Sequence, residues 1–165
     1  MTADLLVTAH YADDADTMFE RASSFADLVE MTRGISTYKG LPALPMVAGR
    51  TYKTDIKVLG LFRCDGYEIK IQNIDREGRR LQSSESNEKI KSWRHSVEVR
   101  PCENGSIWTD RIVIDAGVLT PLVARYAQFM YRYRHRHRKA TSIQSVLKRS
   151  CRTLDAKLPM FFPAD

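Results

Sequence analysis

The chain has 165 residues, of which 43% are hydrophobic, and a formal net charge of +6. This length supports one hydrophobic core, and we expect a single domain over residues 1–140 followed by a basic amphipathic tail over residues 141–165. No apolar run reaches the roughly 18 residues of a membrane span, and the first residues lack the basic and long apolar regions of a signal peptide. These features favour a soluble cytoplasmic protein over a membrane-spanning or secreted one.

The positive charge is concentrated in one segment. Residues 116–154 carry nine Lys/Arg and no Asp/Glu, whereas residues 1–115 carry 16 basic and 18 acidic side chains. Such a segment can bind phosphate or an anionic lipid surface, but a solvated helix face is the simpler explanation, so nucleic-acid binding is not favoured. The three cysteines are odd in number and far apart, which fits neither a disulfide framework nor a metal knuckle. We expect no metal and no cofactor.

The first third of the chain predicts one strand and two short helices. Residues 3–10 have the composition of a strand, and Asp13 or Asp14 can cap the helical pattern that follows. Ser23-Ser24 interrupts that pattern and predicts a break between two helices. A loop rich in glycine and proline then surrounds a short strand near residues 35–38.

The hydrophobic spacing changes from helical to alternating after Arg50. Alternation predicts a half-buried antiparallel sheet, since successive side chains of a strand point to opposite faces. The turn signals are Cys64-Asp65-Gly66, residues 75–78 and Glu103-Asn104-Gly105. The strands that they delimit are 51–60, 67–74, 79–87, 92–99 and 107–115.

The C-terminal part predicts a long helix over residues 119–140. Its expected apolar stripe, about 120° wide, consists of Leu119, Leu122, Val123, Tyr126, Phe129, Met130 and Tyr133. The cations Arg125, Arg132, Arg134, Arg138 and Lys139 are expected outside the stripe. His135 and His137 are two residues apart on the helix, so they cannot chelate one metal together.

The tail predicts a second, shorter helix with a basic outer surface. Ile143, Val146, Leu147, Cys151 and Leu154 recur at helical spacing. Two roles remain open: the helix packs against the domain or a second subunit, or it lies on an anionic membrane. Residues 159–163 are apolar enough to favour burial, for example across a homodimer interface.

Three segments carry a family resemblance. SWRHSVEV resembles a W-x-H strand, with Trp93 and His95 in the matching positions. ENGSIWTDRIVIDAG resembles a G-T-x-x-x-D-x-V strand that contains Asp110, and FMYRYRHR resembles an F-x-Y-R helix end at Phe129. Together they are similar to a bacterial branch of the START and Bet v 1-like superfamily, which includes polyketide cyclase-like and lipid-transport proteins. The resemblance implies an α+β helix-grip fold, in which a curved antiparallel sheet of about seven strands wraps around the long C-terminal helix.

Helix-grip proteins enclose a cavity between the sheet and the long helix, so the resemblance implies that inward-facing residues bind a ligand. The alternation and the helical stripe predict a mostly apolar wall with a few hydroxyl groups. The expected ligand-binding residues are Tyr52, Thr54, Ile56, Tyr67, Ile69, Glu85, Trp93, Val97, Tyr126, Phe129 and Tyr133. The alternative is that these side chains fill the core.

His95 and Asp110 are the candidate catalytic residues. His95 shares a strand face with Trp93 and Val97, and Asp110 is expected as its diagonal neighbour on the next strand. Such a pair can act as a general base, hold a ligand's carbonyl or hydroxyl group, or fix the strand register as a buried polar pair. Glu85, on the facing polar strand, is a third candidate.

We therefore expect a protein that binds or carries a small hydrophobic molecule such as a lipid, quinone, polyketide or aromatic metabolite. The alternative is a cyclase, dehydratase or isomerase that uses His95 as general base and Asp110 to orient it. The chain has no motif of a classical hydrolase or kinase. Peripheral membrane contact through the basic C-terminal helices and homodimer formation are further options.

Overall fold

The computed structural model describes the backbone of residues 1–155 and the side chains of residues 1–139. Seven strands, three α-helices and one 3₁₀ turn make up this part of the chain. In chain order they are β1 (Ala3–Tyr11), α1 (Ala15–Ala22), α2 (Phe25–Met31), β2 (Ser36–Lys39), β3 (Thr51–Val58), β4 (Phe62–Asp75), β5 (Arg80–Ser86), β6 (Ser92–Cys102), β7 (Gly105–Asp115), η1 (Gly117–Leu119) and α3 (Thr120–Asp155).

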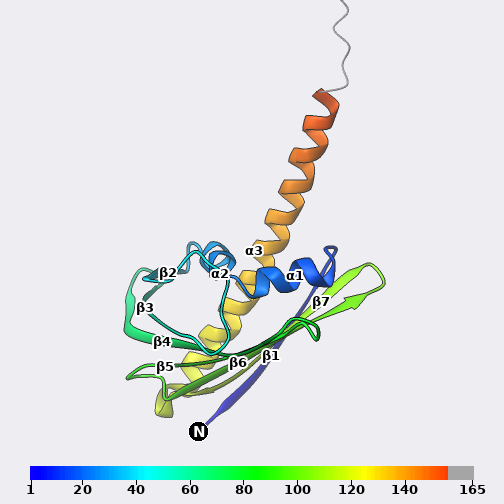
Figure 1. Ribbon diagram of the computed structural model, residues 1–165. Coiled ribbons are helices and arrows are strands. Elements are labelled where there is room, and N and C mark those ends of the chain that lie inside the picture. Colours follow the sequence, from blue (N-terminus) through cyan, green and yellow to red (C-terminus); the bar gives the residue numbers. More distant parts are fainter. Residues whose placement is uncertain (156–165) are drawn as a thin grey trace, which may run out of the picture.

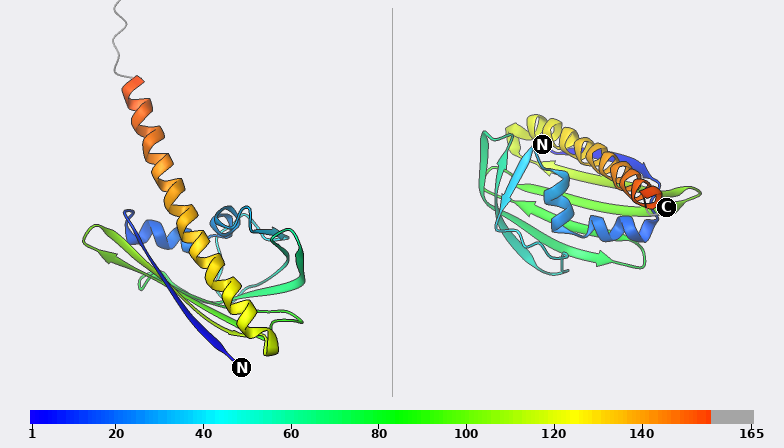
Figure 2. Two further views of the ribbon diagram at one scale, coloured as in Figure 1. Left: turned by 180° about the vertical axis from the view of Figure 1, so that it is seen from behind. Right: turned by 90° about the horizontal axis from the view of Figure 1, so that it is seen from above.

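The strands form one antiparallel sheet in the order β1-β7-β6-β5-β4-β3-β2. The sheet curves, and the three α-helices lie on its concave side, with α3 crossing the strands obliquely (Figures 1 and 2). β2 and β3 curl up toward α2 at one end of the sheet. This arrangement confirms the predicted α+β helix-grip fold of about seven strands around a long C-terminal helix.

The two short helices begin at capping side chains. Asp14 is the N-cap of α1 and accepts a hydrogen bond from the backbone N–H of Thr17 at 2.9 Å. Ser24 caps α2 in the same way through the N–H of Asp27. The predicted break at Ser23-Ser24 is therefore correct, because a serine hydroxyl replaces the backbone bonds that a continuous helix would have made there.

One hairpin turn lies earlier than the sequence predicts. Cys64, Asp65 and Gly66 belong to β4, and the chain turns instead at residues 59–61 between β3 and β4. Leu59 and Gly60 both have positive φ, as tight hairpin turns require. A bulge between Thr54 and Ile56 shifts the register of the two strands, so alternation counted along β3 does not carry through to β4.

The hairpin between β6 and β7 turns where Glu103-Asn104-Gly105 predicts. Gly105 has φ +130°, and a Cβ at this position would lie 2.0 Å from the carbonyl oxygen of Tyr11. Glycine is therefore required for β1 to pair with β7 along its whole length.

α3 packs through a face that overlaps only partly with the predicted stripe. Of the stripe, Met130 is buried, and Val123, Tyr126 and Tyr133 are partly buried against the same core cluster. Leu119, Leu122 and Phe129 are exposed, whereas Thr120, Ala124, Ala127, Tyr131, Arg134, His135 and Arg138 are buried. At 100° per residue the buried face is rotated by roughly a third of a turn from the expected stripe. Small residues on this face let the helix approach β1 and β7 closely, and the buried arginines find partners that helical periodicity does not reveal.

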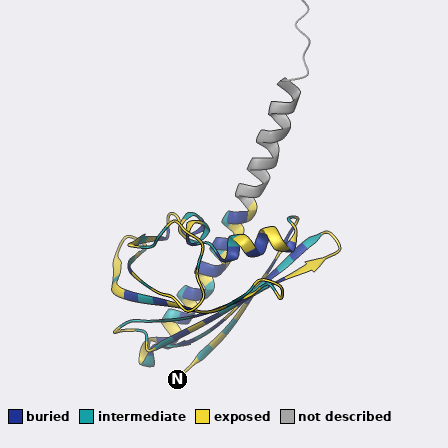
Figure 3. Cartoon of the chain, viewed as in Figure 1, coloured by how far each residue is buried: buried dark blue, intermediate teal, exposed yellow. Residues whose placement is uncertain are grey.

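Three groups of buried side chains hold the layers together. Figure 3 colours the buried positions along the strands and helices. The first packs α1 onto β1, β6 and β7 around Trp108. The second packs α3 onto the same strands through Trp93, Ile112 and Tyr131. The third joins α2 to β4 through Phe25 and Ile71. The space that these groups leave between α3, α2 and the curled end of the sheet is the site described below.

The backbone of α3 is helical without interruption to Asp155. The two helices predicted for residues 119–154 are therefore one. The predicted role of the second helix concerns side chains that lie outside the described residues, as does the predicted burial of residues 159–163. Within the part of the chain that is described, no helix is both long enough and apolar enough to cross a membrane.

Candidate functional site

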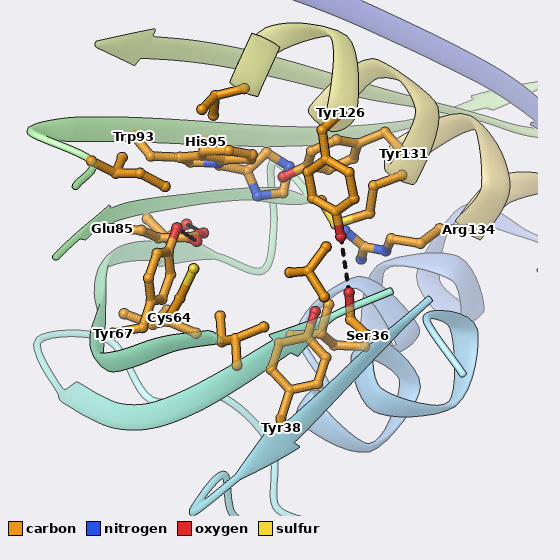
Figure 4. Close-up of a pocket in the computed structure, with 18 of the residues that line it drawn as sticks. Ser36, Tyr38, Cys64, Tyr67, Glu85, Trp93, His95, Tyr126, Tyr131 and Arg134 are labelled. Carbon is orange, nitrogen blue, oxygen red and sulfur yellow. Dashed lines mark hydrogen bonds between the residues drawn. The ribbon is translucent and has the colours of Figure 1, made fainter. Parts of the chain in front are cut away.

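A cavity of about 400 Å³ lies between the concave face of the sheet and α3 (Figure 4). Its wall is mostly apolar. β3, β4, β5 and β6 form one side, and α2, β2 and α3 form the other. The lining residues are Ala22, Phe25, Leu28, Ser36, Tyr38, Met46, Ile56, Val58, Leu59, Phe62, Cys64, Tyr67, Ile69, Ile71, Leu81, Ser83, Glu85, Ile90, Trp93, His95, Val97, Leu122, Val123, Tyr126, Met130, Tyr131 and Arg134.

The cavity opens between the β3–β4 turn and the first turns of α3. Leu59, Phe62 and Leu122 line it, yet their side chains are 46%, 65% and 68% exposed. Three large apolar side chains therefore surround the entrance. An apolar ligand that enters here would meet no charged group among these three.

Most of the predicted ligand-binding residues line the cavity. They are Ile56, Tyr67, Ile69, Glu85, Trp93, Val97 and Tyr126, together with the candidate base His95. They come from β3, β4, β5, β6 and α3. The sequence brings them together because alternation fixes one inward face on each strand.

Four predicted lining residues lie elsewhere. Tyr52 packs edge-on against Phe25, with 4.7 Å between the ring centroids, and its hydroxyl accepts from the N–H of Val47. Thr54 is buried, but its hydroxyl donates to the carbonyl of Lys39 on β2. Both residues precede the bulge in β3, which breaks the alternation on which the prediction rested.

Phe129 and Tyr133 also do not line the cavity. Phe129 is 42% exposed and tilts against Tyr133. The Tyr133 hydroxyl donates to the carbonyl oxygen of Arg33 at 2.8 Å, and its ring stacks on His137. The rotation of α3 about its axis leaves both rings out of the cavity lining.

Glu85 brings a carboxyl group into the cavity. It accepts a hydrogen bond from the Tyr67 hydroxyl at 2.9 Å, and both groups point inward from the sheet (Figure 4). Burial raises the pKa of Glu85, although the nearby His95 and the bond from Tyr67 oppose the shift. Burial also raises the pKa of Tyr67 well above its ordinary value, so its hydroxyl stays protonated as a donor.

His95 lies at the cavity wall, and a hydrogen bond to the buried Asp110 orients its ring. Its Nε2 is 2.7 Å from Oδ1 of Asp110, and Asp110 is the diagonal neighbour that the sequence predicts. A carboxylate can only accept, so we assign the hydrogen of the His95 ring to Nε2. No hydrogen bond within residues 1–139 engages the Nδ1 of His95. This nitrogen can accept a proton or a hydrogen bond from a ligand.

Asp110 also binds a second histidine, His135, which the sequence analysis did not pair with it. Nε2 of His135 lies 2.8 Å from Oδ2 of Asp110, and Nδ1 of His135 lies 2.5 Å from the Tyr11 hydroxyl. Because the Asp110 carboxylate can only accept, we assign the hydrogen of the His135 ring to Nε2. Its Nδ1 is then an acceptor, and the Tyr11 hydroxyl donates to it. One chain of hydrogen bonds therefore joins Tyr11 on β1, His135 on α3, Asp110 on β7 and His95 on β6.

Burial and hydrogen bonding shift the pKa values of Asp110 and His135 in this hydrogen-bond network. Burial by itself would raise the pKa of Asp110, but hydrogen bonds from His135 and His95 outweigh it and hold that pKa below its usual range. Burial lowers the pKa of His135, with Asp110 opposing the shift. At neutral pH we therefore expect an ionised Asp110 between two rings, with His135 uncharged.

Two arginines of α3 are buried. Arg138 forms an ion pair with Asp27 on α2, donates to the Tyr11 hydroxyl at 3.4 Å and lies over the Trp108 ring. Arg134 lines the cavity and lies over the Tyr131 ring, with 5.1 Å between its guanidinium carbon and the ring centroid. Sequence reasoning placed both on the solvent side, because it assigns cations to the surface by default.

The helix side of the cavity carries two polar groups that the sequence did not indicate, the hydroxyls of Ser36 and Tyr38. The Tyr126 hydroxyl lies 3.0 Å from the Ser36 hydroxyl. Tyr38 points its hydroxyl into the cavity from β2, and burial raises its pKa to about 12. β2 is a four-residue strand within a loop-rich segment, so no periodicity could have identified its inward side chains. Among the described residues, no three His, Cys, Asp or Glu side chains converge as metal ligands do.

The chain matches one protein family in sequence. Residues 26–141 match the sequence profile of a family described as "Domain of unknown function (DUF8410)". This match spans more than two-thirds of the chain. The chain belongs to this family. No curated protein sequence matches it significantly.

Solved structures share the fold of this DUF8410 protein at low sequence identity. Protein CV1439 from Chromobacterium violaceum superposes with a TM-score of 0.66 at 8% identity, over 83% of this chain and 95% of that one. Ara h 8.0201 gives 0.59 at 12% identity, over 82% and 96%. A point mutant of norcoclaurine synthase from Thalictrum flavum, in complex with a transition state analogue, gives 0.57 at 14%, over 84% and 97%. These similarities place the chain in the helix-grip, Bet v 1-like fold.

Proposed function

We propose that this DUF8410 protein binds a small hydrophobic molecule in the cavity between its sheet and α3. The observation that carries the proposal is a mostly apolar space of about 400 Å³ into which a few polar groups converge. Binding pockets for small molecules have volumes of roughly 300–1,000 Å³ and the same mixture of apolar wall and sparse polar groups. The norcoclaurine synthase of similar fold was solved with a transition state analogue, which supports a ligand-binding role for such a fold.

The cavity can be tested with a fluorescent apolar probe, N-phenyl-1-naphthylamine, and two variants that add the same ring. Val97→Phe places a phenyl group into the cavity from β6, because Val97 lines it. Val113→Phe places the same group on the opposite face of the neighbouring strand β7, as the alternating burial along β7 indicates. We expect the probe to bind the wild type and Val113→Phe, with at least tenfold weaker binding to Val97→Phe.

The stability of Val97→Phe is an internal check on this experiment. Adding a ring to a filled core costs about 1–3 kcal/mol, whereas adding it to an open cavity does not. We therefore expect Val97→Phe to unfold at a denaturant concentration close to that of the wild type. A strongly destabilised Val97→Phe, together with a wild type that does not bind the probe, would show that side chains fill this space.

A second candidate function rests on the hydrogen bond between His95 and Asp110. A histidine at a cavity wall, oriented by a carboxylate 2.7 Å away, has the arrangement of a general base. The corresponding activity is that of a cyclase, dehydratase or isomerase, with His95 taking a proton from the ligand and Asp110 orienting the ring. Glu85 is close enough to influence His95 electrostatically and would act as a second acid or base.

The variant His95→Ala distinguishes a carrier from an enzyme. If the protein is an enzyme, turnover of its bound ligand falls by about 10²–10⁴-fold, while the affinity for the ligand changes little. If the protein is a carrier, His95→Ala leaves the ligand chemically unchanged during incubation, as does the wild type. The measurement is mass spectrometry of the ligand before and after incubation with each protein.

A further inference from the structure

Arg134 is a buried cation without a bonding partner in the described part of the chain. The residue is 8% exposed, and its Nε is inaccessible and makes no hydrogen bond. Figure 4 shows its side chain pointing from α3 into the cavity. A guanidinium group remains protonated at all physiological pH values, so this positive charge is permanent.

The neighbours of Arg134 do not neutralise it by contact. The Tyr131 ring lies under the guanidinium at 5.1 Å, and Glu85 and the Tyr38 hydroxyl feel its charge from a distance. Glu85 extends from the sheet toward Tyr67, not toward Arg134. His135, the next residue on α3, donates to Asp110. Arg138, one turn later, has its own carboxylate in Asp27. Arg134 has none.

An isolated buried charge is costly in free energy. A bound ligand of opposite charge would offset this cost. Arginine presents a planar fork of N–H donors that matches a carboxylate with two parallel hydrogen bonds. We propose that Arg134 binds the carboxylate of an apolar carboxylic acid, and that this acid is the ligand class of the cavity. The inference rests on the proposed binding function and narrows it from hydrophobic molecules in general to hydrophobic acids.

The charges that line the cavity favour a monoanion. Arg134 is the single Lys or Arg among the described lining residues, and Glu85 is the single carboxyl group. A carboxylate with one negative charge is matched by Arg134 alone. A phosphate monoester carries nearly two negative charges, and Arg134 can pair with only one of them. The second charge would be unpaired in a cavity that also contains the Glu85 carboxyl group.

The position of Arg134 also sets the orientation of the ligand. Leu122 lies at the entrance, and Arg134 follows it by twelve residues along α3, which corresponds to about 18 Å along the helix axis. The carboxylate would therefore lie deep in the cavity, and the apolar body would extend toward Leu59, Phe62 and Leu122. His95 and Glu85 line the same cavity as this ligand.

The first test uses the wild-type protein and two probes of the same chain length. Decanoate and decan-1-ol each displace N-phenyl-1-naphthylamine at pH 8, where decanoate is fully ionised. An apolar cavity without a cation prefers the alcohol, because an ionised carboxylate is costly to remove from water. We expect the opposite order, with decanoate displacing the probe at a lower concentration than decan-1-ol.

The second test removes the charge while keeping the apolar stem. Arg134→Met should weaken decanoate binding by about 10- to 100-fold, as expected for the loss of a charged hydrogen-bonded pair, and leave decan-1-ol unchanged. Arg134→Lys keeps the positive charge but lacks the planar fork of donors. Its affinity for decanoate should lie between those of the wild type and Arg134→Met. Arg132→Met is the matched control, since Arg132 is exposed on the same helix, and it should bind both probes as the wild type does.

The outcomes separate this inference from the function on which it rests. If the wild type does not bind N-phenyl-1-naphthylamine, the proposed function fails and the inference with it. If the probe binds but decan-1-ol displaces it better than decanoate, the inference alone is overturned. Equal decanoate binding by wild type and Arg134→Met also overturns it. Thermal unfolding without ligand shows that Arg134→Met is folded, and we expect its melting temperature to equal or exceed that of the wild type.

Discussion

Asp110 accepts a hydrogen bond on each of its carboxylate oxygens, from His95 on one side and His135 on the other. The side chain is 1% exposed, so these two rings replace the water that a carboxylate normally binds. They also connect two strands and a helix through one residue. Asp110 therefore orients the candidate base and anchors α3 at the same time.

Asp110→Asn tests this double role. The amide has nearly the same shape, but its NH₂ group faces one of the two histidine N–H donors and cannot accept from it. We expect a loss of about 3–5 kcal/mol in the free energy of unfolding, the usual cost of breaking a buried charge network. Urea denaturation measures it.

Asp4→Asn is the matched control for this variant. Asp4 lies on the neighbouring strand and pairs with Arg111 at the surface. Exposed ion pairs contribute little, so we expect no measurable change in the unfolding midpoint. A similar loss in both variants would contradict the role assigned to Asp110.

His135 should make the protein sensitive to mild acid. It is faced by Asp110 from β7, Tyr11 from β1 and the cations Arg134 and Arg138 from its own helix, and burial holds its pKa below 6.5. The unfolded chain therefore binds a proton that the folded chain refuses, so stability falls as the pH drops below about 6.5, by up to about 1.4 kcal/mol per pH unit.

The measurement is the free energy of unfolding at pH 7.5, 6.5 and 5.5, for the wild type and His135→Gln. The glutamine can still donate to Asp110 and accept from Tyr11. Subtracting the two profiles removes the contribution of Glu85, whose raised pKa acts in the opposite direction. Parallel profiles would contradict the assignment of a neutral, buried His135.

At the residue scale, the sequence predicts what lies on strands better than what lies on the helix. The contact between His95 and Asp110 follows from strand alternation and hairpin register. His135 and Arg134 could not be assigned, because a histidine or arginine within a basic segment looks like a solvated residue. Their burial depends on Asp110 and on the Tyr131 ring, which no local pattern connects to them.

At the scale of elements, Arg138 connects α3 with α2 and β1. Its guanidinium pairs with Asp27, donates to Tyr11 and covers the Trp108 ring, and the residue is 1% exposed. This contact holds α2 against α3, where both form one side of the cavity. The predicted apolar stripe misses this anchor because it assigns cations to the other face.

Arg138→Met should destabilise the protein by about 3–5 kcal/mol, since Asp27, which is 12% exposed, loses its partner. Combining it with Asp27→Asn should restore part of this loss, because no unpaired charge is then left. Arg136→Met, on the exposed face of α3, serves as the control and should change stability by less than about 0.5 kcal/mol. A double variant as unstable as the sum of the single ones would show that the two residues do not interact.

The order of elements and the antiparallel pairing were predictable, since caps, alternation and turn residues are local signals. The rotation of α3 was not. It follows from Ala124 and Ala127 fitting closely against the sheet, while Leu122 lies at the cavity entrance and Phe129 is exposed to solvent. Side-chain volumes on several elements determine this fit together, and a pattern on one helix does not contain them.

At the scale of the whole molecule, a curved sheet that is wider than the helix crossing it leaves a space on one side. The rows of buried side chains around Trp108 and Trp93 close the other side. The sequence predicts that such a space exists through its resemblance to helix-grip proteins. Its volume and the presence of one arginine among its described lining residues depend on the three-dimensional packing.

The most direct test of the account is native mass spectrometry of the protein purified from its own host, followed by denaturing extraction and identification of any released molecule. We predict that a hydrophobic molecule leaves the wild type in a 1:1 ratio and is missing from Val97→Phe, with Val113→Phe loaded as the wild type is. If the released molecule carries a carboxylate, Arg134 explains why. A wild type that leaves the host with the same bare mass as Val97→Phe would contradict the claim that this cavity is a binding site.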